Sequence, residues 1–189
     1  MRPFALPLAG LALLACQPLP PPQEATLTPH IPPGQFAPDQ TDQAIIGAQE
    51  TFALGRGLQG DPARTARATA YMEFLANDFV TTRWLTASPV VAPQLQIAKR
   101  DLRGFLNIAQ DAPSQPVINA MLSAADALKA GDKTGAERAL AGGPFRDPPA
   151  VTLARLDAMP RIASVAGGAN LAWNARFRPR EDGSCRFPC

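Results

Sequence analysis

Residues 95–109 read LQIAKRDLRGFLNIA, and this stretch has the clearest periodicity in the chain. Apolar side chains recur at spacings of three and four residues, which is typical of a helix with one buried face. The members of this apolar stripe are Leu95, Ala98, Leu102, Phe105, Leu106 and Ala109. The charged residues lie off the stripe and are Lys99, Arg100, Asp101 and Arg103. The pattern predicts an amphipathic helix that keeps its charges away from the core.

Similar patterns flank this stretch on both sides. They predict helices at 42–58, 62–85, 114–131, 132–140 and from 148 to a break at Pro160, followed by an apolar turn at Leu171 and Trp173. Asp61 and Asp132 stand where N-caps belong, and Pro62 suits a first helical position. Strand-like alternation over five or more residues occurs nowhere. The prediction is an all-α fold, a compact bundle of five or six helices over residues 41–175.

Residues 127–140, ALKAGDKTGAERAL, resemble the αα-hairpin turn of helical repeat proteins. A tetratricopeptide array would repeat such a hairpin every 34 residues or so. No convincing second copy occurs at that spacing. The repeat architecture is therefore an alternative to the bundle, not the leading prediction.

The composition restricts the classes of protein to which the chain can belong. Its 189 residues suffice for one domain plus an arm, and 46% hydrophobic residues are enough for a buried core. A formal net charge of +2 gives no electrostatic reason to expect nucleic-acid binding. The 14 glycines follow no three-residue period, which excludes a collagen. No second long apolar run exists, which excludes a polytopic membrane protein.

Residues 1–15 are predicted to be a signal peptide. Arg2 gives a short, positively charged start, and residues 4–14 form an uncharged apolar stretch of 11 residues. A bilayer-spanning helix needs about 20 apolar residues, so this stretch has the length of a signal-peptide core instead.

The apolar stretch ends at Leu13-Leu14-Ala15-Cys16, which resembles the lipobox of bacterial lipoproteins. The resemblance covers only this N-terminal region. It implies cleavage between Ala15 and Cys16 and a diacylglycerol on the Cys16 sulfur, which would anchor the protein on a membrane. In a Gram-negative host, Gln17 after the cysteine implies the periplasmic face of the outer membrane. The alternatives are an ordinary secretory peptide with an incidental cysteine and a cytosolic protein with an apolar start.

Residues 16–40 are predicted to carry the lipid and a disordered, proline-rich tether. Eight prolines lie within residues 17–40, and they disfavour helix and favour an extended polyproline II chain. Fully stretched, this segment would reach about 75 Å. His30, the chain's one histidine, lies in this segment, where no pocket is expected to make it catalytic. A proline-rich ligand for a partner domain is the alternative to a simple spacer.

Residues 176–189 are predicted to be a basic tail with a pair of cysteines. An oxidising periplasm would permit a disulfide between Cys185 and Cys189, and free or intermolecular thiols are the alternative. A structural zinc site needs four ligands, and no further cysteine or nearby histidine supplies them. Arg176, Arg178 and Arg180 are candidates for binding an anionic partner, against the alternative of a solvated tail.

No motif of a serine hydrolase, a zinc protease, a P-loop or a dinucleotide-binding loop occurs in the chain. No catalytic residue, metal ligand or cofactor is therefore predicted. Glu73 and Asp78 are the carboxylates considered for acid–base chemistry, although their five-residue spacing places them on different helix faces.

The sequence thus predicts a non-enzymatic, lipid-anchored periplasmic protein that binds or helps to assemble envelope components. Its expected partners are the membrane, through the lipid, and an envelope protein; no nucleic acid is expected. A carrier of small apolar ligands is the first alternative. A carboxylate-dependent cell-wall hydrolase is the second.

Overall fold

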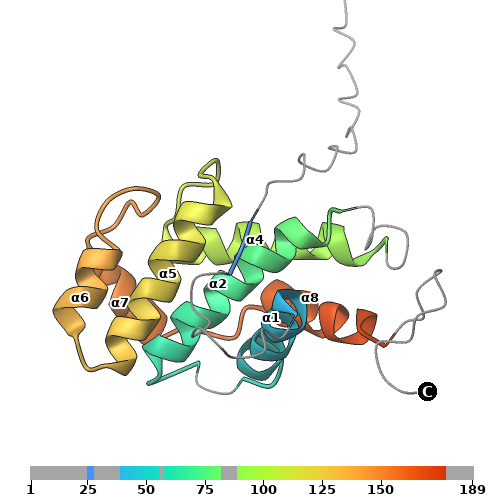
Figure 1. The fold of residues 1–189 in the computed structure, drawn as a ribbon, viewed down its shortest axis with the longest axis horizontal. Helices are drawn as coiled ribbons and strands as arrows, with labels where there is room; N and C mark the ends of the chain where they lie inside the picture. The colour runs from blue at the N-terminus through green and yellow to red at the C-terminus, as the bar shows by residue number, and fades with distance from the viewer. Residues whose placement is uncertain (1–24, 28–38, 56–57, 82–88, 178–189) are drawn as a thin grey trace, which may run out of the picture.

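Seven α-helices and one π-helical turn form the part of the chain that the structure describes. The computed structural model describes residues 25–27, 39–55, 58–81 and 89–177 (Figure 1). The elements in chain order are α1 (Gln40–Ala48), the π-helical turn η1 (Gln49–Ala53), α2 (Pro62–Asp78), α4 (Val91–Leu106), α5 (Ser114–Lys129), α6 (Lys133–Ala139), α7 (Pro149–Asp157) and α8 (Ala163–Ala175). These described ranges hold two isolated antiparallel bridges and no strand. The predicted all-α bundle is confirmed, with one helix more than expected.

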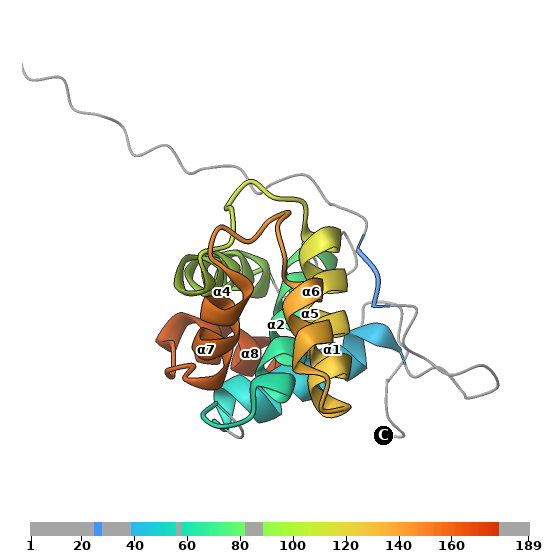
Figure 2. The same cartoon turned by 90° about the vertical axis from the view of Figure 1, so that its left-hand side faces the viewer.

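Helix α2 lies at the centre of the molecule and contacts α1, α4, α5 and α7. The α5–α6 hairpin lies with α7 at one end, whereas α4 and α8 pack together toward the other (Figure 1). The end-on view places α2 between α4 and α5 (Figure 2). The first and last helices of the described ranges also meet, because α1 and η1 pack on α8.

Local sequence explains where several helices begin and end. The carboxylates of Asp61 and Asp132 cap α2 and α6, accepting hydrogen bonds from the backbone N–H of Arg64 at 2.9 Å and of Gly135 at 2.7 Å. Helix α7 ends before Pro160, the residue that the sequence predicts as its break. These helix starts and this break could be predicted from the sequence because each depends on residues close by in the chain.

The C-terminal helix differs from the prediction. The sequence predicts only an apolar turn at Leu171 and Trp173, which is wrong, since α8 runs from Ala163 to Ala175. The helix passes through Gly168, where an added Cβ would lie 3.2 Å from the Cβ of Ala98 on α4. The missing side chain lets α8 approach α4 closely, so this glycine serves packing.

The apolar stripes that the periodicity identifies form the core. Leu95 and Leu102 of α4 are fully buried, as are Ile118 and Met121 of α5. The charges of α4 do not all avoid the core, contrary to the prediction, because Arg103 is only 1% exposed. A charged group at this depth requires a partner.

Residues 25–27 of the predicted tether lie on the helical domain, and its last residue, Gln40, begins α1. Leu27 is 5% exposed and belongs to the core, and Thr26 bonds to Gln40 of α1 and to Gln115 of α5. The segment is therefore not separate from the domain along its whole length. Of the helices in the described ranges, none has the length and apolar character needed to span a bilayer.

Candidate functional site

A buried ion pair joins α2 to α4. Arg103 Nε donates to Glu73 Oε1 at 2.6 Å, and Arg103 Nη2 donates to Glu73 Oε2 at 2.8 Å. Guanidinium and carboxylate thus meet in a bidentate pair, the geometry that arginine forms best. Both side chains are buried, so the pair is shielded from water and from screening by salt.

Arg103 also fixes the loop between α4 and α5. Its Nη1 donates to the backbone carbonyls of Ala109 at 3.1 Å, Gln110 at 3.0 Å and Ala112 at 2.9 Å. Its Nη2 lies 3.3 Å from Ser114 Oγ at the start of α5. The guanidinium nitrogens are therefore occupied by hydrogen bonds within the molecule, and Arg103 has a structural role instead of a ligand-binding one.

Lys99 extends this cluster toward the surface. Its Nζ donates to Ser114 Oγ at 2.8 Å and lies 3.8 Å from Glu73 Oε2. Burial lowers the pKa of Lys99, although the nearby Glu73 carboxylate acts in the opposite direction. A lysine beside a serine can activate a nucleophile in an open site. Ser114 is only 1% exposed, however, so its hydroxyl is closed to a substrate.

The two candidate carboxylates of α2 do not come together. Glu73 faces α4, whereas Asp78 Oδ2 accepts a hydrogen bond from Thr41 Oγ1 of α1 at 2.9 Å. Their different faces agree with the prediction from spacing. Because Arg103 occupies both oxygens of Glu73, this geometry does not support Glu73 as the catalytic carboxylate of a hydrolase. Among the described residues, no three His, Cys, Asp or Glu side chains gather in a way that could hold a metal ion.

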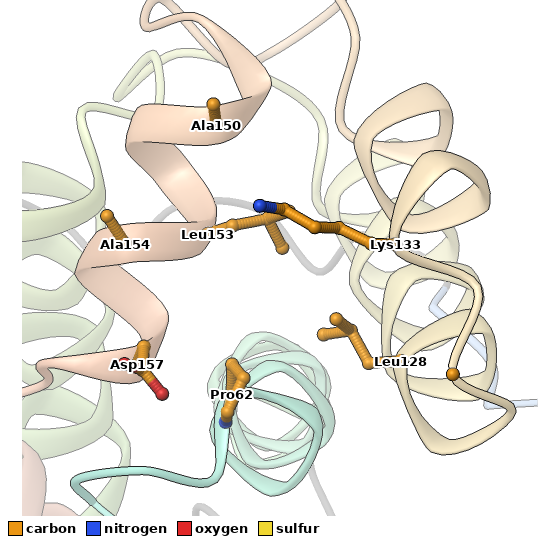
Figure 3. Close-up of a pocket in the computed structure, with 8 residues that line it drawn as sticks. Pro62, Leu128, Lys133, Ala150, Leu153, Ala154 and Asp157 are labelled. Atoms are coloured by element: carbon orange, nitrogen blue, oxygen red, sulfur yellow. The ribbon is translucent and has the colours of Figure 1, made fainter.

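An open groove lies between α7 and the α5–α6 hairpin, with the first residue of α2 at its base (Figure 3). Its volume is about 330 Å³, near the lower end of the range for small-molecule sites. Most of its lining is apolar. The lining residues are Pro62, Leu128, Gly131, Lys133, Ala150, Leu153, Ala154 and Asp157.

Lys133 and Asp157 bring the two charges of the groove. Lys133 comes from α6 and Asp157 from the end of α7, and Figure 3 shows them on different walls. Neither side chain makes a hydrogen bond or ion pair with any residue in the described ranges. A matching occupant would combine an apolar group with an anion near Lys133 or a hydrogen-bond donor near Asp157.

No protein-family model, curated protein or solved structure matches this chain. The sequence did hold one signal for the buried pair that the prediction missed. Glu73 stands within the otherwise uncharged run TAYMEFLA at 69–76, and a buried acid calls for a cation on a facing helix. Lys133 and Asp157 had no such signal, because the groove is assembled from elements distant in the chain.

Most of the site residues predicted from the sequence lie outside the described residues. These are Ala15, Cys16, Arg178, Arg180, Cys185 and Cys189, and His30, for which no role is predicted, lies outside them as well. Arg176 is described, and its Nε donates to Asp42 Oδ1 at 3.2 Å while its guanidinium lies 4.8 Å from the ring centre of Trp173. At 8% exposed, Arg176 ties α8 to α1 and does not stand in a solvated tail. The anion-binding prediction is thereby left to Arg178 and Arg180.

Proposed function

We propose that the chain is a lipid-anchored, non-enzymatic protein of the bacterial envelope, which binds a partner protein and assists its assembly. The observation that carries the proposal is Leu13-Leu14-Ala15-Cys16 at the end of an 11-residue apolar stretch. The apolar stretch brings the cleavage point to the membrane, and the Cys16 thiol supplies the sulfur of a thioether. Two or three acyl chains then give durable anchoring, since each buried CH₂ contributes about 0.8 kcal/mol.

The proposed location is the periplasmic face of the outer membrane in a Gram-negative host, because Gln17 follows the cysteine. Two features of the helical domain support a binding role instead of a catalytic one. Arg103 occupies both carboxylate oxygens of the buried Glu73, which was a candidate for acid–base chemistry. The groove, by contrast, presents a cation, Lys133, and an anion, Asp157, that pair with no residue in the described ranges, above an apolar base, which suits recognition of a partner.

Processing of the precursor tests the anchor. Cys16→Ala is expected to leave the first 15 residues in place and to carry no acyl groups, which intact-mass spectrometry of the membrane and soluble fractions would show. Cys189→Ser is the matched control, because it removes a cysteine and keeps the lipobox. Normal cleavage and membrane retention of Cys16→Ala would refute the proposal.

Affinity capture tests the groove. Proteins that co-elute with the full-length anchored chain are compared with those from Lys133→Glu, which reverses the charge on one wall. Arg138→Glu is the control, since Arg138 is an exposed cation of the same helix that does not line the groove. A specific partner is expected to drop at least about tenfold with Lys133→Glu alone. Equal recovery from both variants would exclude the groove as the binding face.

A carrier of small apolar ligands is the second candidate, and the groove itself favours it. Leu128 and Leu153 offer an apolar base in a space of about 330 Å³. Native mass spectrometry of gently extracted protein would then find a bound small molecule that Leu153→Asp releases. A ligand-free spectrum of the unaltered protein would remove this candidate.

A further inference from the structure

The segment Ala25–Leu27 is bound to the helical domain in the manner of a peptide ligand. The side-chain amide of Gln115 holds both backbone groups of Thr26: the Thr26 N–H donates to Gln115 Oε1 at 2.8 Å, and Gln115 Nε2 donates to the Thr26 carbonyl at 3.0 Å. This pair of bonds resembles the exchange between two antiparallel strands. Both of these Gln115 bonds go to backbone atoms of Thr26. The prolines in the flanking sequence favour the extended conformation in which such backbone groups are accessible.

Two further contacts complete the site. The Leu27 N–H donates to Gln40 Oε1 at 2.9 Å, and the Leu27 side chain enters the core. Gln115 is itself oriented, because its Nε2 also donates to Asn119 Oδ1 at 2.7 Å. The site thus combines a buried apolar anchor with oriented amides, the usual elements of peptide recognition.

We infer that this is an in-chain docking site that sets the distance and the orientation of the domain relative to the membrane. The inference rests on the proposed lipid anchor at Cys16. With Ala25–Leu27 docked, only the eight residues 17–24 separate the lipid from the domain, and they span at most about 25 Å. A tether free as far as residue 40 would reach up to about 75 Å when fully stretched.

Docking also decides at which end of the molecule the tether is attached. Gln40 begins α1 and Gln115 lies in the first turn of α5, so the tether joins the domain at the N-terminal ends of these helices. Leu128, which lines the groove, lies 13 residues farther along α5, or about 20 Å away. The docked tether therefore attaches the domain at the end of α5 that lies opposite the groove, which leaves the groove accessible to a partner in the periplasm.

Amide hydrogen exchange on the lipid-free mature chain, starting at residue 16 with Cys16→Ser, tests the docking. The amides of Thr26 and Leu27 are expected to exchange at least about tenfold more slowly than in an unstructured chain. Gln115→Ala and Leu27→Ser should each remove this protection and leave the amides of α2 unchanged. Gln94→Ala, which changes an exposed glutamine of α4, should have no effect. Rapid exchange of Thr26 and Leu27 in the unaltered chain would overturn the inference, whatever the fate of Cys16.

Energy transfer on vesicles tests the distance. The lipidated protein, with both tail cysteines changed to serine and a donor dye on Asp111→Cys near the start of α5, is placed on phosphatidylethanolamine–phosphatidylglycerol vesicles with acceptor-labelled headgroups. Releasing the tether with Leu27→Ser and Gln115→Ala together should lower the transfer at least about twofold. Unchanged transfer would overturn the spacing role. A protein that fails to bind vesicles would contradict the lipid anchor instead, and the exchange result would still stand.

Discussion

A single guanidinium holds together three parts of this domain. Arg103 binds the Glu73 carboxylate of α2, three carbonyls of the loop after α4 and the Ser114 hydroxyl at the start of α5. A buried ion pair gives little net stability compared with a well-packed apolar pair, but removing one partner leaves an uncompensated charge in the core. The position of Arg103 is therefore far more sensitive to change than its charge alone suggests.

Arg103→Met is expected to lower the free energy of unfolding by about 3–5 kcal/mol, because the buried Glu73 carboxylate loses its bidentate partner and retains the longer contact with Lys99 Nζ at 3.8 Å. The double variant Glu73→Leu/Arg103→Met should recover at least about 1 kcal/mol of that loss, since the buried carboxylate is removed together with its arginine. Urea unfolding followed by far-UV circular dichroism measures both. Arg100→Met is the control on the same helix, where the arginine side chain is 66% exposed and the change should stay within about 0.5 kcal/mol. Equal losses for Arg103→Met and Arg100→Met would contradict this assignment.

Lys99 adds a dependence on alkaline pH. Burial lowers its pKa in the folded state below the value of about 10.4 that the unfolded chain has. Between the two values the unfolded state binds more protons, so the free energy of unfolding gains a contribution that rises with pH. Burial raises the pKa of Tyr71, which acts in the opposite sense above about pH 10.

Comparison with Lys99→Met separates the two groups, because Tyr71 is present in both proteins. The stability of the unaltered chain relative to Lys99→Met should increase as the pH rises from neutral toward about 10.4. Urea unfolding at a series of pH values gives this difference directly. A difference that is flat or falls with pH would show that Lys99 is not penalised by burial in the folded state.

Among the elements, α4 and α8 are joined by small residues. A Cβ on Gly168 would meet the Ala98 Cβ at 3.2 Å and Leu95 Cδ2 at 3.5 Å, whereas nothing lies within 4 Å of one on Gly167. Gly168→Val should therefore force the helices apart and cost about 1–3 kcal/mol of unfolding free energy. Gly167→Val should change it by less than about 0.5 kcal/mol. Urea midpoints measure both, and equal shifts would mean that this contact does not limit the packing.

The same elements show how far sequence reasoning reaches. Helix starts were accurate where a cap is local, as at Asp61 and Asp132. Helix ends were less accurate: the predicted segment 42–58 ends in a π-helical turn at Ala53, and α2 ends at Asp78 although its prediction extended to residue 85. The need for glycine at position 168 of α8 arises from Ala98 on α4, which is distant in the chain. The burial of Arg103 likewise depends on Glu73 of α2. Periodicity within one helix contains no information about either.

For the molecule as a whole, the docked tether is close to balance. Burying Leu27 contributes about 1.5–3 kcal/mol, and each of its neighbouring hydrogen bonds adds about 0.5–1.5 kcal/mol. Fixing the backbone of three residues costs about 1–2 kcal/mol apiece. Because the opposing sums are similar, one lost contact is enough to shift the population toward the released tether. With the proposed lipid anchor at Cys16, modest changes at Gln40 or Gln115 would then adjust the distance between membrane and domain.

Contacts between the N-terminal and C-terminal helices of the described domain also distinguish this bundle from a repeat array. In an array each unit contacts only its neighbours, so an end unit can unfold first. Here the C-terminal helix α8 packs on α4 and η1, and the Arg176–Asp42 pair joins it to α1. Losing α8 would therefore expose the N-terminal elements as well, and the domain should unfold in one step.

That cooperativity is measurable at α8 itself. In Trp84→Phe, Trp173 of α8 is the only tryptophan left, and its fluorescence reports on this helix alone. Its urea midpoint should coincide with the midpoint from far-UV circular dichroism, which reports on all helices. A tryptophan transition at clearly lower urea would mean that α8 leaves first, and it would favour the stacked hairpins that the ALKAGDKTGAERAL segment suggests. Coincident transitions would establish that the first and last helices are held in one cooperative unit, as their contacts require.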